Sequence, residues 1–95
     1  MNRIEQHPIL VTATLELAYD NGAVNRERTE AQVIESCSES LVGYSDTDLA
    51  EVTTELDALN AEDLGTVLTG DQDDPVCKAL SRKANELLNT LFEAL

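Results

Sequence analysis

The stretch that decides the fold runs from Thr29 to Cys77 and reads TEAQVIESCSESLVGYSDTDLAEVTTELDALNAEDLGTVLTGDQDDPVC. It contains thirteen acids and no Lys, Arg or His. The residues before it carry a net charge of −1 and those after it +1, so the formal −13 of the 95-residue chain lies in this stretch. Its apolar residues recur every three or four positions, which is typical of amphipathic helices. The stretch therefore predicts helices whose outer faces are strongly negative.

Three helix starts can be located within the stretch. Thr29 with Gln32 and Ser45 with Asp48 match capping boxes, in which each side chain accepts a hydrogen bond from the other residue's backbone N–H. Asn60, three residues before Asp63, marks a third start. The apolar stripes that follow these starts are Ile34, Cys37 and Leu41; Leu49, Val52, Leu56 and Leu59; and Leu64, Val67 and Leu68. We expect Gly43 to end the first of these helices and Gly70 the last.

Both flanking segments also have helical patterns. Pro8 suits the first position of a helix, because the N–H that it lacks would have no partner there. Residues 9–18 are apolar nearly all round, which predicts a central helix that ends at Asn21-Gly22. At the other end, Asp74 and Pro75 begin a pattern with 3-4 spacing that continues to Leu95. We interpret this as one long C-terminal helix.

These patterns predict an all-α protein, a compact bundle of four or five short helices with a long C-terminal helix. Hydrophobic residues make up 42% of the chain and aromatic residues 3%, so we expect an aliphatic core within a single helical domain, residues 1–95. The first and last helices should lie at its centre. The leucines expected to be buried are Leu10, Leu17, Leu56, Leu80, Leu87 and Leu91.

No catalytic or metal-binding motif is apparent, so we expect neither an enzyme nor a cofactor. Asp71-x-Asp73-Asp74 fails the calcium-loop pattern, which requires Gly at its sixth position and Glu at its twelfth. Cys37 and Cys77 lie on apolar stripes and lack metal-ligand spacing, so we interpret them as small buried hydrophobic residues. His7, next to Pro8, has no nucleophile to activate.

Charge and hydropathy also predict location and exclude some partners. The first residues lack the basic-then-apolar order of a signal peptide, and no apolar run approaches the ~20 residues that span a bilayer. A chain this negative is repelled by anionic lipid and by nucleic acid. We therefore expect a cytoplasmic protein, in the host cytoplasm if it is phage-encoded, that contacts neither membrane nor nucleic acid directly.

The acidic stretch is the candidate binding surface. Its ordinary explanation is a solvated face that keeps a small protein soluble. Against this, solubility requires no such localisation, and like charges without interspersed Lys reduce stability. We therefore predict a carboxylate-rich face that binds a partner protein with a basic surface, which includes nucleic-acid-binding proteins. The predicted partner-binding residues are Asp48, Glu51 and Glu55, supported by Glu35, Glu39, Glu62 and Asp63.

In size and charge the chain resembles the small acidic proteins by which phages and plasmids block restriction or CRISPR systems. The resemblance implies a nucleic-acid mimic, an inhibitor that occupies the basic groove of a nucleic-acid-binding protein.

Two alternatives remain open. One is an assembly chaperone or adaptor, for example in phage tail assembly, that binds its partner through an apolar groove. The other is a structural helical dimer whose seam is the run from Leu87 to Leu95. The sequence is compatible with a monomer or a homodimer.

Overall fold

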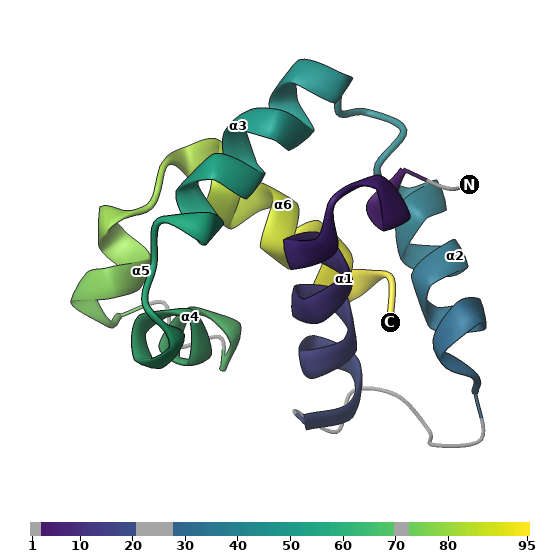
Figure 1. The fold of residues 1–95 in the computed structure, drawn as a ribbon, viewed down its shortest axis with the longest axis horizontal. Coiled ribbons are helices and arrows are strands. Elements are labelled where there is room, and N and C mark those ends of the chain that lie inside the picture. The colour runs from purple at the N-terminus through teal and green to yellow at the C-terminus, as the bar shows by residue number, and fades with distance from the viewer. Residues whose placement is uncertain (1–2, 21–27, 70–72) are drawn as a thin grey trace.

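The computed structural model describes residues 3–20, 28–69 and 73–95, and they contain helices and turns but no strand. The prediction of a compact all-α fold is thereby confirmed (Figure 1). The elements are η1 (Ile4–Gln6), α1 (Pro8–Leu15), η2 (Glu16–Asp20), α2 (Glu30–Ser40), α3 (Asp46–Asp57), α4 (Ala61–Leu68), α5 (Pro75–Ala79) and α6 (Arg82–Glu93).

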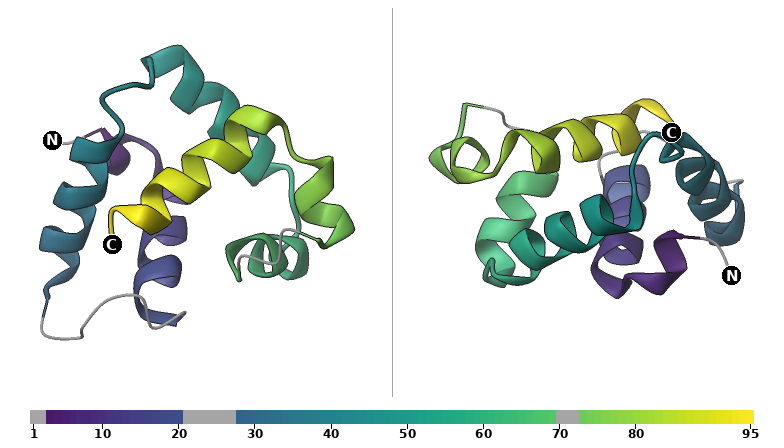
Figure 2. Two further views of the ribbon diagram at one scale, coloured as in Figure 1. Left: turned by 180° about the vertical axis from the view of Figure 1, so that it is seen from behind. Right: turned by 90° about the horizontal axis from the view of Figure 1, so that it is seen from above.

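Helices α1 and α6 occupy the centre of the fold, as the sequence predicts. Helix α1 contacts α2, α3 and η1, and α6 contacts α3, α2 and η2. Figure 2 shows α6 crossing one face of the bundle, from α5 towards α2. Helices α4 and α5 pack together at one end of the molecule, and α2 lies at the other end (Figure 1).

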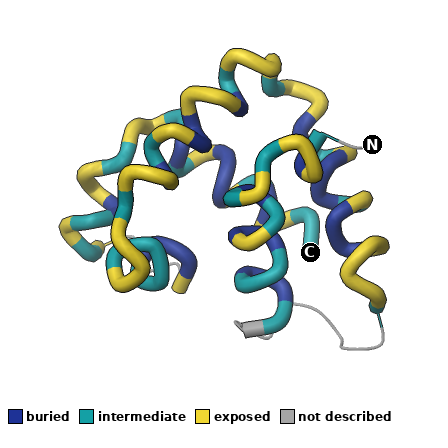
Figure 3. Tube along the Cα trace, viewed as in Figure 1, coloured by how far each residue is buried: buried dark blue, intermediate teal, exposed yellow. Residues whose placement is uncertain are grey.

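The core is aliphatic and continuous from η1 to α6. Its large fully buried side chains come from η1, α1, α2, α3 and α6 and from Leu41 just after α2, and buried positions alternate with exposed ones along the helices (Figure 3). Five of the six leucines expected to be buried are buried: Leu10, Leu17, Leu56, Leu87 and Leu91. The sixth, Leu80, is only partly buried and packs at the edge of the core.

Leu80 is displaced because the predicted long C-terminal helix is divided in two. Leu80 and Ser81 have extended backbone angles, with ψ of 153° and 156°. The Ser81 hydroxyl accepts a hydrogen bond from the backbone N–H of Ala84 at 3.2 Å, so it caps a new helix, α6. Ser side chains compete with helical hydrogen bonds in this way. The prediction of one helix from Pro75 to Leu95 is wrong, although α6, at 12 residues, is among the longer helices.

The predicted starts of the middle helices are confirmed. Both hydrogen bonds of each capping box form, Thr29 with Gln32 at 3.0 and 3.2 Å and Ser45 with Asp48 at 3.1 Å each. Asn60 accepts from the N–H of Asp63 at 2.7 Å. Helix α2 ends at Ser40, just before the predicted stop at Gly43. The predicted stops at Asn21-Gly22 and Gly70 lie outside the described residues.

The first predicted helix changes its winding part-way. It is α-helical from Pro8 to Leu15 and continues as a π-helical turn, η2. Next to this junction, the side chain of Thr14 is fully buried, and its hydroxyl has no hydrogen-bond partner in the described part of the chain. A buried hydroxyl without a partner lowers stability, because it has lost its hydrogen bonds to water.

Thr14→Val should therefore raise the free energy of unfolding by about 1 kcal/mol, because Val keeps the shape and removes the hydroxyl. Chemical denaturation of both proteins measures the change. Thr53→Val is the matched control, since the buried Thr53 hydroxyl donates to the backbone carbonyls of Leu49 and Ala50. That control should be neutral or destabilising. A Thr14→Val protein less stable than the parent would contradict the argument.

Candidate partner-binding surface

The seven predicted partner-binding carboxylates lie on three helices. Glu35 and Glu39 are on α2, Glu62 and Asp63 on α4, and the remaining three on α3. Because α2 and α4 lie at opposite ends of the molecule, the seven do not form one compact face (Figure 1). Each group is therefore considered separately.

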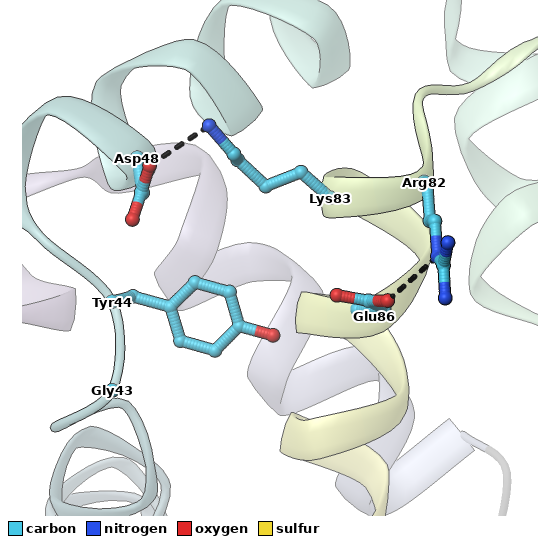
Figure 4. Close-up of a pocket in the computed structure, with 6 residues that line it drawn as sticks. All are labelled: Gly43, Tyr44, Asp48, Arg82, Lys83 and Glu86. Atoms are coloured by element: carbon cyan, nitrogen blue, oxygen red, sulfur yellow. Dashed lines mark hydrogen bonds and ion pairs between the residues drawn. The ribbon is translucent and has the colours of Figure 1, made fainter.

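On α3, Asp48 and Glu51 share one ammonium group. Lys83 Nζ, in the first turn of α6, lies 2.8 Å from Asp48 Oδ1 and 2.6 Å from Glu51 Oε2. Figure 4 shows Lys83 reaching across from α6 to Asp48. The side chain of Asp48 is 29% exposed, that of Glu51 57% and that of Lys83 39%. These three residues form a cluster at the interface between α3 and α6 that water can reach.

The cluster shifts the titration of its members. The hydrogen bond from Lys83 and then the backbone N–H of Ser45 lower the pKa of Asp48 below its ordinary value. The hydrogen bonds to Asp48 and Glu51 in turn raise the pKa of Lys83. Because the pKa of Asp48 is lowered on folding, its contribution to stability is present at neutral pH and is lost as the pH falls through the folded pKa.

The third carboxylate, Glu55, holds the start of α6. Its Oε1 accepts from the backbone N–H of Ser81 at 2.9 Å, and its Oε2 accepts from the Ser81 hydroxyl at 2.5 Å. Both donors are neutral, so neither of these hydrogen bonds brings a cation to Glu55. All three α3 carboxylates therefore contact the N-terminal end of α6, a second role that the sequence reasoning missed. Replacing them by Lys would place three cations next to Lys83 and would loosen this contact.

The described part of the chain contains two further ion pairs. Arg82 pairs with Glu86 within α6 at 3.0 Å, and Arg3 lies 3.4 Å from Asp46. Arg3 also donates to the carbonyls of Leu41 and Tyr44, which fixes the loop between α2 and α3 to the N-terminal segment. None of these cations pairs with a carboxylate of α2 or α4.

Glu35 and Glu39 on α2 have no such internal role. Both are exposed, they stand one turn apart, and no ion pair reaches them within the described residues. Like charges at this spacing are unfavourable, and Glu39 also lies in the last turn of α2, where the macrodipole is negative. Val42, just beyond the helix, is 83% exposed.

By contrast, Glu62 and Asp63 lie in the first turn of α4, where the macrodipole stabilises acids.

The described residues provide little for chemistry. They contain no group of three His, Cys, Asp or Glu side chains placed to hold a metal ion, and no helix among them is long and apolar enough to cross a membrane. Asp71, from the rejected calcium pattern, lies outside the described residues. Cys37 and Cys77 are both buried and form no disulfide, and burial raises the pKa of Cys37 to about 11.

Comparisons of the chain with protein-family models, with curated proteins and with solved structures find no match.

The cluster around Lys83 leads to a stability prediction. Lys83→Met should lower the melting temperature, because it leaves Asp48 and Glu51 facing each other without a cation, whereas Lys78→Met should change it little. Lys78 is exposed and forms no ion pair within the part of the chain that the structure describes. Thermal unfolding at low salt and at about 0.5 M salt measures the melting temperatures of the parent and of both variants. The drop in melting temperature caused by Lys83→Met should be smaller at high salt, because salt screens the charges. Equal effects at low salt would contradict a role for the cluster.

Proposed function

We propose that this chain is a non-enzymatic acidic protein that binds a basic surface of a partner protein, as a nucleic-acid-mimic inhibitor of anti-restriction or anti-CRISPR type. The observation that supports the proposal is the pair Glu35 and Glu39, followed by the exposed Val42. Within the part of the chain that the structure describes, no ion pair reaches the two carboxylates, and like charges one turn apart disfavour the helix that carries them.

The geometry of α2 suits a groove that normally holds nucleic acid. Carboxylates one helical turn apart have Cβ atoms about 5–6 Å apart, and B-DNA presents one charge per ~1.7 Å of axis over two strands. The two carboxylates and the negative end of the helix dipole thus concentrate negative charge near the end of α2. The chain's net charge of −13 would add long-range attraction and accelerate association with a basic partner.

The other candidate carboxylates take different parts in this proposal. Asp48, Glu51 and Glu55 contact the start of α6 and also contribute to the overall negative field. Glu62 and Asp63 lie at the far end of the molecule and would be reached by a partner that extends along its long axis.

The test is binding of proteins from a host lysate to the immobilised chain at low salt. The parent should retain basic nucleic-acid-binding proteins, and duplex DNA or about 0.5 M salt should release them. The variant Glu35→Lys/Glu39→Lys should fold normally, because both positions are exposed. It should retain little of the basic nucleic-acid-binding proteins.

A matched control separates the α2 surface from total charge. Asp57→Lys/Glu93→Lys changes the net charge equally, at two exposed positions on other helices. This control should retain most of the binding. Equal retention by the α2 variant, or retention that duplex DNA does not reduce, would contradict the proposal.

A further inference from the structure

A second surface lies at the end of the molecule away from α2. The end of α3, the start of α4 and helix α5 border an open groove whose apolar wall is formed by Leu59, Val76, Ala79 and Leu80. The break between α5 and α6 creates this wall, because it leaves Leu80 partly exposed in place of the full burial that its spacing predicts. Leu59 and Val76 are also partly exposed.

Two carboxylates line the same groove. Glu55 accepts hydrogen bonds from neutral donors on Ser81, and none of the described ion pairs includes it. The side chain of Asp63 forms no ion pair among the described residues. Its hydrogen bond to Asn60 uses the backbone N–H and leaves the carboxylate out. The groove thus combines an apolar wall with negative charge.

The negative charge beside the apolar wall determines which kind of molecule can bind in the groove. A second copy of the chain carries −13 and would be repelled, and so would a nucleic acid or an anionic lipid. The complementary ligand is a segment with apolar side chains on one face and Lys or Arg beside them, the pattern of helix-in-groove recognition. We propose that the groove binds a basic amphipathic helix of a partner protein.

This inference goes beyond the α2 surface and does not require it. A charge mimic would need no apolar contact, whereas the groove would add short-range specificity to a protein attracted by long-range charge. The two sites lie at opposite ends of the molecule, so each can be removed without the other (Figure 1).

The test uses the full chain, labelled with ¹⁵N, and a short peptide with Leu and Lys at helical spacing. This peptide should shift the amide resonances of Leu59, Val76 and Leu80. A peptide with Ser in place of Leu should leave them unmoved, and one with Glu in place of Lys should bind at least about tenfold more weakly, a difference of about 1.4 kcal/mol. Groove resonances that fail to move with the Leu/Lys peptide would overturn the proposal.

Variants locate the binding within the molecule. Ala79→Arg places a bulky cation on the groove wall at an exposed helical position and should weaken binding about tenfold or more. Ala50→Arg makes the same change of charge at an exposed position of α3 outside the groove and should bind normally. Equal effects of the two variants would overturn the proposal, as would groove shifts that grow with protein concentration alone, which would indicate a second copy as occupant.

The variant Glu35→Lys/Glu39→Lys distinguishes the two proposals. It should lose binding of the basic partner through α2 but still show the groove shifts with the Leu/Lys peptide. Loss of the groove shifts in this variant would contradict an independent groove.

Discussion

The contact that Lys83 makes with Asp48 and Glu51 joins the central helix α6 to the acidic stretch. Thirteen carboxylates lie in a stretch without a basic residue, and Lys83, from the neighbouring segment, neutralises part of this charge where α6 meets α3. Glu55 completes the contact through Ser81, the residue at which α6 begins. The same interaction therefore positions the central helix α6 and reduces repulsion along α3.

The acidic stretch thus has several functions within one fold. Asp48 and Glu62 lie in first turns, where helix dipoles stabilise them, and Asp48 also closes a capping box. Glu51 and Glu55 join α3 to α6. No ion pair within the described residues reaches Glu35 or Glu39, and these are the two carboxylates for which we propose a partner. Local contacts explain the positions of the first-turn acids and of the α3 carboxylates better than a solvated face does.

Local signals made much of the fold predictable. Thr29, Ser45 and Asn60 each begin a helix because their side chains accept hydrogen bonds from nearby N–H groups, and such pairs can be read from the sequence. The break at Ser81 was missed, because 3-4 spacing of apolar residues continues through it and a capping Ser looks like any other polar residue. The partners of Asp48, Glu51 and Glu55 were missed because they are contacts with residues 26 or more positions away, which spacing does not reveal.

The titration of the Asp48 carboxyl group tests this account most directly. Carbon-detected NMR can follow it in the parent and in Lys83→Met. In the parent we expect a pKa below the ordinary value of about 3.9, because Lys83 and the Ser45 N–H bond to the carboxylate. In the variant the pKa should rise but stay somewhat low, because the Ser45 N–H still bonds to Asp48. An ordinary pKa in the parent, or the same value in both proteins, would contradict the claim that Lys83 joins α6 to the acidic stretch.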